Sequence, residues 1–233
     1  MASRDLRDLP APVRIRHAAL QLFAARGFDA TGIREIAEVA AIPTSLLYHY
    51  RRSKEEILRD LILEGLARHL ESSRRALELA ATPEEGIRTM VGIHVLVPVR
   101  NPEMARIMES EVRALGAASQ ELVRVKRAEG DQRWLSVLRD GVASRVFDVP
   151  EPRFAGRLLR RLCTGIGIWY TPREPMGVDE LITRLSDHAL ALVRARRDGS
   201  DVRGDDLVRP TVAQLQAIVD EAHSEDLDER VAG

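Results

Sequence analysis

The apolar residues of this chain recur at intervals of three and four positions, the spacing of a helix with one buried face. Residues 13–26 show the pattern first, with Ile15, Leu22 and Phe23 on one stripe. Gly27 follows where a left-handed residue would end the helix. The same spacing continues along the chain, helix formers dominate the composition and aromatic residues are only 4%. We therefore predict an all-α fold.

Residues 33–58 predict two short helices, a tight turn between them and the start of a third helix. The first helix carries Ile33 and Ile36, and Thr31 is placed to cap it. Pro43 suits the first position of the second helix, which we expect at 44–50. Ser53 and Glu56 form a capping box for the third. This is the geometry of a helix-turn-helix, although on the pattern alone a plain helical corner explains it equally well.

Further helices follow with the same periodicity and with proline or glycine at the breaks between them. We expect a long helix over 53–80 and a helix from Pro83 that stops before Pro98. The remaining expected helices cover a segment beginning at 101, then 119–140, 152–171, 178–197 and, with less periodicity to support it, 211–222.

The expected domains follow from these segments. Residues 1–12 are polar and predict a mobile arm, and residues 13–58 a helix-turn-helix domain. Residues 59–198 predict a helical-bundle domain. Residues 199–233 are acidic and predict a tail with one extra helix, either packed on the bundle or mobile.

Composition narrows the class of protein. The net charge is −1, but residues 12–54 hold seven basic and three acidic side chains, a local excess typical of nucleic-acid binding. The single Cys163 leaves no internal disulfide and fits a reducing cytoplasm. No apolar run reaches the roughly 20 residues of a membrane span. We find no metal-ligand spacing, phosphate loop or nucleophile motif, so we expect no cofactor and no enzyme activity.

The residue string around the predicted turn carries a family resemblance. Ile15-Arg16, Ala18-Ala19-Leu20, Leu22-Phe23-Ala24 and Gly27-Phe28 are followed by Thr31, Ile36-Ala37, Leu47-Tyr48-His49-Tyr50 and Ser53-Lys54-Glu55-Glu56. Over residues 12–60 this resembles the DNA-binding domain of the TetR/AcrR family of transcriptional regulators. The remainder resembles the family in architecture alone.

The resemblance implies which residues contact double-stranded operator DNA. Thr31, Tyr48 and Lys54 fall at positions that bind phosphates, and Lys54 would begin a helix whose N–H groups favour an anion. Thr44, Ser45 and His49 are the candidates for base-edge contacts. Arg34 has two open interpretations. It contacts a phosphate or a guanine, or it is a charged residue exposed to solvent.

Three positions depart from the family pattern. Ala41 stands where the turn usually has glycine, which costs about 1 kcal/mol if the residue is left-handed. Pro43 replaces a common serine and removes a hydroxyl contact. Arg51 stands where phenylalanine is usual, so either the core closes differently there or Arg51 adds a phosphate contact.

For the bundle, the resemblance implies an apolar effector pocket with a few polar groups, although each candidate alone is more often a core residue. The candidates are Met90, His94, Met104, Met108, Glu111, Trp134, Cys163 and Trp169. Residues 167–172, with Gly177 and Asp179-Glu180-Leu181, resemble members that respond to acyl-CoA thioesters of fatty-acid or sterol catabolism. Four arginines could contact a CoA phosphate, and an ordinary charged helix face explains them equally well. They are Arg157, Arg160, Arg161 and Arg173.

The resemblance also implies a homodimer through the helices expected at 152–171 and 178–197, where small residues such as Gly156 and Ala189 would let helices approach. An intramolecular hairpin is the alternative. We expect a dimeric repressor that a small apolar effector releases from its operator. An activator, a corepressor-dependent regulator and an all-α protein-interaction module are the rival interpretations.

Overall fold

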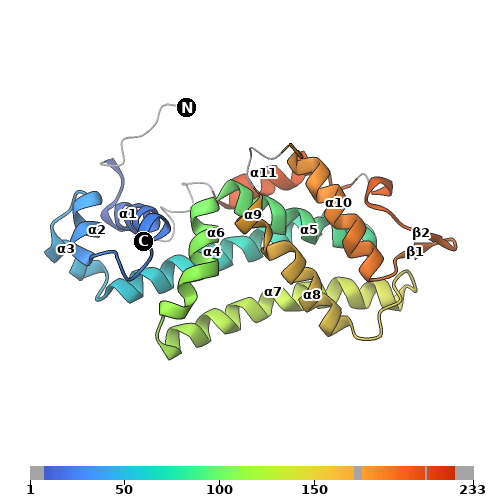
Figure 1. Ribbon diagram of the computed structural model, residues 1–233, viewed down its shortest axis with the longest axis horizontal. Coiled ribbons are helices and arrows are strands. Elements are labelled where there is room, and N and C mark those ends of the chain that lie inside the picture. Colours follow the sequence, from blue (N-terminus) through green and yellow to red (C-terminus); the bar gives the residue numbers. More distant parts are fainter. Residues whose placement is uncertain (1–7, 171–174, 208, 224–233) are drawn as a thin grey trace. The chain divides into compact units, whose positions relative to one another are not determined.

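The computed structural model describes residues 8–170, 175–207 and 209–223. These residues form an all-α fold with one short antiparallel strand pair, as predicted apart from the strands (Figure 1). The helices are α1 Ala11–Arg26, α2 Ile33–Val39, α3 Thr44–Tyr50, α4 Lys54–Leu77, α5 Pro83–Arg100, α6 Pro102–Ser110, α7 Ala117–Ala143, α8 Pro152–Thr164, α9 Ile166–Trp169, α10 Val178–Leu192 and α11 Val212–Ala222. Shorter elements are the 3-10 turns η2 Glu111–Ala114 and η3 Gly204–Asp206, and strands β1 Arg196–Arg197 and β2 Ser200–Asp201.

The described residues divide into two compact units. The first, which we call the head, contains residues 8–67, residues 103–126 and His223. The second, which we call the body, contains residues 68–102 and 127–222. The division differs from the boundary that we predicted after residue 58, because α6, η2 and the first turns of α7 pack with the head. No described helix is long and apolar enough to cross a membrane.

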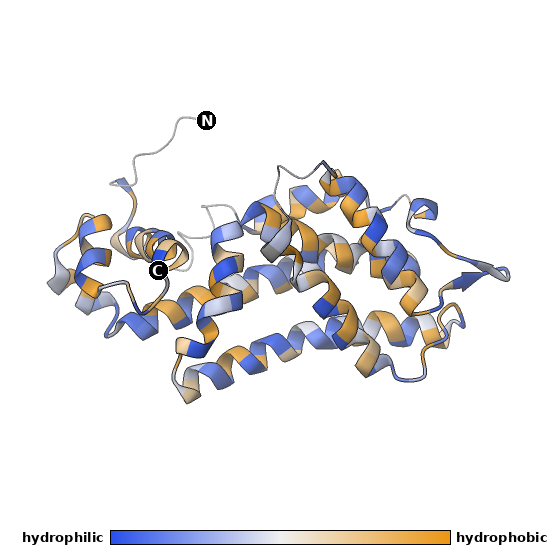
Figure 2. Ribbon diagram, in the orientation of Figure 1, coloured by the Kyte–Doolittle hydropathy of each residue, from blue (hydrophilic) through white to orange (hydrophobic). Residues whose placement is uncertain are grey.

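The head is built around the buried stripe of α1. Ile15, Leu22 and Phe23 are at most 6% exposed and pack with the inner faces of α2, α3 and α4. Figure 2 shows both hydrophobic (orange) and hydrophilic (blue) positions on each of these helices. Gly27 ends α1 with φ +82° and ψ 168°, a region that only glycine enters readily, rather than the left-handed helical region that we expected.

The body is built around α5, in which Gly86–Leu96 are almost fully buried. Helices α8, α9, α10 and α11 all contact it. Gly92 leaves a notch that Leu215 of α11 fills, since a Cβ at Gly92 would lie 2.4 Å from Leu215 Cδ1. Residues that we assigned to a tail are therefore part of the body, because the apolar side of α11 completes its core.

Several helix ends differ from the predicted ones. Helix α1 begins at Ala11, which shortens the expected arm. Helix α5 continues past Pro98 to Arg100, because a proline one turn from a helix end removes only one hydrogen bond. The helix expected over 152–171 divides at Gly165 into α8 and α9. Residue 171, the last of the expected helix, and the start of the loop expected after it lie outside the described residues.

Candidate DNA-binding surface

The turn between α2 and α3 is a Schellman motif, a hydrogen-bonded helix ending that requires a left-handed residue. The N–H of Ile42 donates to Ala37 O at 3.0 Å, and the N–H of Ala41 donates to Glu38 O at 3.0 Å. Ala41 has φ +52°, so the position where the family resemblance predicts glycine does adopt the left-handed conformation. An alanine there stores about 1–2 kcal/mol of strain.

Arg14 of α1 holds the same turn from outside. Its Nη1 donates to Ala41 O at 3.2 Å. Sequence patterns gave no sign of this contact, because it joins residues 27 positions apart through one long side chain. The turn is thus fixed both by its own backbone bonds and by α1.

Helix α3 presents one side to solvent and buries one residue. Leu47 is fully buried. The opposite side carries Ser45, Tyr48 and His49, which are exposed, and Thr44, which is half-buried. Tyr48 is 50% exposed. The four residues expected on α3 for DNA contact therefore lie together on its outer side.

Thr31 and Lys54 do not join that exposed set. Thr31 is 1% exposed and its hydroxyl donates to Gly27 O at 2.8 Å, so it does not cap α2, whose N-cap is Gly32. Lys54 Nζ donates to Phe28 O at 2.6 Å and to Thr31 O at 2.8 Å, and lies 4.1 Å from the centre of the Phe28 ring. Lys54 therefore fixes the loop between α1 and α2, and two of its three ammonium protons are engaged.

Arg34 and Arg51 differ in their surroundings. Arg34 is exposed on α2, where the described part of the chain gives it no ion pair. Arg51 follows α3 and forms an ion pair with Asp60 of α4, with Nε 2.9 Å from Oδ2. The N-cap of α4 is as expected, since the N–H of Glu56 donates to Ser53 Oγ at 3.1 Å.

The expected effector-pocket residues fall into separate groups. Met90, His94, Trp134 and Cys163 are buried in the body. Met104 and Met108 lie in the head against Gly65, whose missing side chain leaves room for both sulfur atoms. Glu111, also in the head, accepts a hydrogen bond from the N–H of Phe28 at 3.2 Å. Trp169 is 54% exposed.

His94 is the polar centre of the buried group. Its Nδ1 lies 2.8 Å from Met90 O, and its Nε2 lies 3.4 Å from Trp134 Nε1 and 3.3 Å from His69 Nε2. Burial lowers the pKa of His94 to about 4, so the ring is neutral at pH 7. Burial also raises the pKa of the Cys163 thiol to about 12, so this thiol is unreactive.

The basic residues expected to hold a CoA phosphate do not form one cluster among the described residues. Arg157 and Arg161 are exposed on α8. Arg160 pairs with Asp131 of α7 at 2.6 Å. Arg173 lies outside the described residues.

An apolar strip runs along the outside of α8. Phe154, Leu158 and Leu162 are 57%, 43% and 39% exposed and stand four residues apart, so they share one face of the helix. Exposed apolar residues in a row are typical of interaction surfaces.

A helix-turn-helix with an exposed second helix, carried by an all-α chain, defines the class of DNA-binding transcriptional regulators. Two family models match the chain: the bacterial regulatory proteins of the tetR family over residues 15–61, and the tetracyclin repressor-like C-terminal domain over residues 80–193. The chain belongs to the TetR family and is a DNA-binding helix-turn-helix transcriptional regulator, not an enzyme.

Individual relatives agree with this assignment. The chain is 31% identical to the transcriptional repressor KstR2 of Rhodococcus jostii over 175 residues, which is 69% of this chain and 80% of the relative. It is 27% identical to KstR2 of Mycolicibacterium smegmatis over 184 residues, 75% and 88% of the two chains.

Solved structures share the fold. The TetR-family regulator PfmR of Thermus thermophilus has 26% identity and a TM-score of 0.70, covering 79% of this chain and 99% of its own. AibR, solved with isovaleryl coenzyme A and operator DNA, has 17% identity and a TM-score of 0.70, covering 80% and 100%.

Replacing Ala41 by glycine should raise the free energy of unfolding by about 1 kcal/mol, because glycine adopts the left-handed conformation without strain. Urea denaturation at one fixed protein concentration measures the change. Ala128→Gly, at an exposed right-handed position of α7, is the control and should lower stability by about 1 kcal/mol. Equal losses in both variants would show that Ala41 is not strained.

Proposed function

We propose that the protein is a homodimeric, cytoplasmic repressor that reads its operator with α3 and leaves it when a small apolar effector binds. The observation that carries the proposal is the outer side of α3, which exposes hydrogen-bonding side chains while Leu47 anchors the helix from beneath. A helix held in this way fits the major groove, where short polar side chains reach base edges.

We assign the contacts by position and exposure. Ser45, Thr44 and His49 are the proposed base-reading residues, and Tyr48 is a proposed phosphate contact. Arg34 adds a positive charge on the exposed side of α2. Thr31, whose hydroxyl donates to Gly27 O, and Lys54 support the site by holding the α1–α2 loop, and the remaining ammonium proton of Lys54 completes the proposed phosphate set.

Replacing Tyr48 by alanine should weaken binding to all DNA sequences at least ten-fold, because a hydrogen bond to a charged phosphate contributes roughly 1.5–3 kcal/mol and each head of the dimer loses one. Fluorescence anisotropy on operator and unrelated duplexes measures the change, and Tyr48→Phe isolates the hydroxyl. His49→Ala should instead change the ranking of operator variants. Unaltered binding by both Tyr48 variants, with the helical spectrum intact, would remove this residue from the site.

The proposed dimer uses the apolar strip of α8 together with α10. Two α8 strips and two α10 helices would form a four-helix arrangement around a two-fold axis. Small or buried residues on the inner side of α8, such as Ala155 and Gly156, let it pack closely within its own chain and leave the strip for the partner.

Leu158→Glu should convert the dimer to a monomer, because the interface would have to bury an unpaired carboxylate. Sedimentation velocity at a fixed protein concentration measures the state. Leu122→Glu is the matched control, since Leu122 is 51% exposed on α7 and is not part of the strip. A dimer that survives Leu158→Glu, or that both changes dissociate equally, would exclude this interface.

For the effector we propose an acyl-CoA thioester. The support is similarity to KstR2 and to AibR, of which the latter was solved with isovaleryl coenzyme A. We keep Met90, His94, Trp134 and Cys163 as the proposed acyl-chain environment, with Trp169 as further lining, and Arg157, Arg160, Arg161 and Arg173 as proposed phosphate contacts. Release requires only that the effector bind more tightly to a conformation with lower DNA affinity.

The experiment is operator anisotropy at two salt concentrations, with and without a panel of acyl-CoAs, and with free CoA as control. We expect specific binding that falls with salt and that one acyl-CoA, but not free CoA, reverses. Specific binding that no acyl-CoA alters would retain the repressor and exclude this effector class. Binding without sequence preference would count against α3 as the reading helix.

A further inference from the structure

We propose that Arg51 and Asp60 form a clamp that sets the orientation of α3 for operator reading, and that Arg51 is not itself a DNA contact. The proposal rests on the use of α3 as the recognition helix, which is part of the proposed function. It concerns a residue pair that joins the end of α3 to α4.

Helix α3 needs an attachment at its C-terminal end. It has seven residues, of which Leu47 is buried and Leu46 is partly buried against the same core, and the α2–α3 turn holds its start. None of these contacts holds the last turn of the helix. A base contact requires hydrogen-bond distances and angles within narrow limits, so the end of the helix must also be held.

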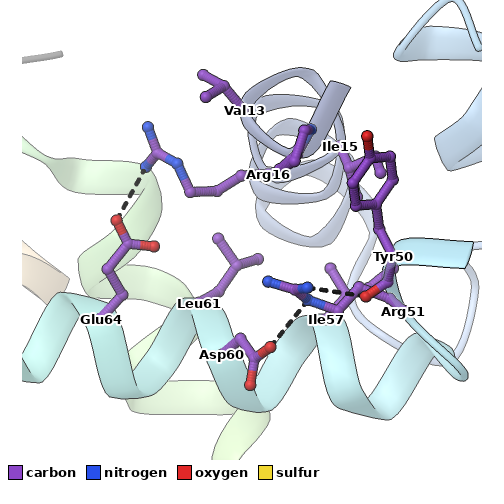
Figure 3. Close-up of a pocket in the computed structure, with 10 residues that line it drawn as sticks. Val13, Ile15, Arg16, Tyr50, Arg51, Ile57, Asp60, Leu61 and Glu64 are labelled. Carbon is purple, nitrogen blue, oxygen red and sulfur yellow. Dashed lines mark hydrogen bonds and ion pairs between the residues drawn. The ribbon is translucent and has the colours of Figure 1, made fainter. Parts of the chain in front are cut away.

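Arg51 holds that end. Its N–H donates to Leu47 O at 2.9 Å, which closes the last turn of α3. Its Nη1 donates to Tyr50 O at 2.8 Å, and its Nε lies 2.9 Å from Asp60 Oδ2 on α4. Figure 3 shows the guanidinium between the two oxygens. One side chain therefore connects a backbone carbonyl of the recognition helix to α4.

Two further residues brace the clamp. Arg59 donates through Nε and Nη2 to Asp60 Oδ1 at 2.9 and 2.7 Å, so both oxygens of Asp60 are engaged. Glu56 accepts the N–H of Arg52 at 2.7 Å and lies 3.4 Å from Arg59 Nη2. The chain just after α3 is thus attached to α4 at two successive residues, 51 and 52.

Apolar packing is incomplete beside this clamp. A hollow of about 70 Å³ lies between α1, the end of α3 and α4 (Figure 3). Val13, Ile15, Ile57 and Leu61 contribute to its walls, and Tyr50 stands at its edge. The side chain of Arg51 borders this space without filling it. The hydrogen bond and ion pair of Arg51 therefore hold the end of α3 against α4, in place of a packed apolar ring.

The phosphate-contact hypothesis for Arg51 makes the opposite prediction. If Arg51 met a phosphate, Asp60 would compete with DNA for its guanidinium, and removing that carboxylate would strengthen binding. If Arg51 is a clamp, removing the carboxylate frees the end of α3 and weakens operator binding. The sign of the effect of Asp60→Asn separates the two.

The experiment compares Asp60→Asn with Glu64→Gln in the full-length protein. Glu64 lies one turn further along α4 and faces Arg16 of α1 at 3.9 Å, so its replacement removes the same charge without touching α3. Relative to Glu64→Gln, Asp60→Asn should weaken operator binding roughly three- to ten-fold, the range expected for one partly exposed ion pair in each of two heads. Binding to unrelated duplexes and the thermal midpoint should stay unchanged.

Three more variants test the pair itself. Asp60→Glu keeps the carboxylate and should restore most of the operator affinity. Arg51→Gln should weaken operator binding to a similar extent, and the double variant Arg51→Gln/Asp60→Asn should be no weaker than either single one. A reduction of the salt slope by about two in Arg51→Gln, one for each head of the dimer, without loss in Asp60→Asn, would instead identify Arg51 as a phosphate contact.

The outcomes are separable from the proposed function. Tighter or unchanged operator binding by Asp60→Asn overturns the clamp while Tyr48→Ala still tests α3. Equal losses on operator and unrelated DNA, with a lowered thermal midpoint, would show a general structural role and also overturn it. A loss of affinity by Asp60→Asn that is confined to operator duplexes supports the clamp.

Discussion

The ammonium of Lys54 is the interaction on which the arrangement of the head depends. It joins the first turn of α4 to two carbonyls of the loop after α1 and lies against the Phe28 ring. Phe28 O also accepts the N–H of Thr31 at 3.2 Å, so Lys54 adds a charged donor to this loop at the point where the chain enters α2. A charged donor is a strong partner for carbonyl oxygens, and the aromatic face adds attraction. The position of α2, and with it the turn and α3, follows from this contact.

The helices and the head could be predicted from the sequence because their signals are local. Periodicity placed α2 and α3, and Leu47 with its exposed neighbours followed from one helical turn. The ends of α7 and α10 were predicted less well. Both close in Schellman motifs with arginine in the left-handed position, Arg145 and Arg194. A search for glycine or proline cannot find such ends, because tertiary contacts bear the strain.

The candidate DNA-binding surface was also predictable only where the signals are local. The outer side of α3 could be predicted, since exposure there depends only on which residue is buried. The surroundings of Thr31, Lys54 and Arg51 could not, because their partners lie 4, 23–26 and 9 residues away and are reached by single side chains. The pocket residues were the least predictable. Burial alone does not distinguish a core methionine or tryptophan from one that meets a ligand.

The head contains a second stretch of the chain, residues 103–126, and this has a consequence for modularity. Ile107, Leu115 and Val123 complete its apolar core, and Glu55 accepts hydrogen bonds from Gly116 and Ser119. The reading module is therefore discontinuous in sequence. Recombination that exchanged only the first 67 residues between relatives would separate the two halves of one core. Descent should therefore preserve α6 and the start of α7 together with the rest of the head, however far the body diverges.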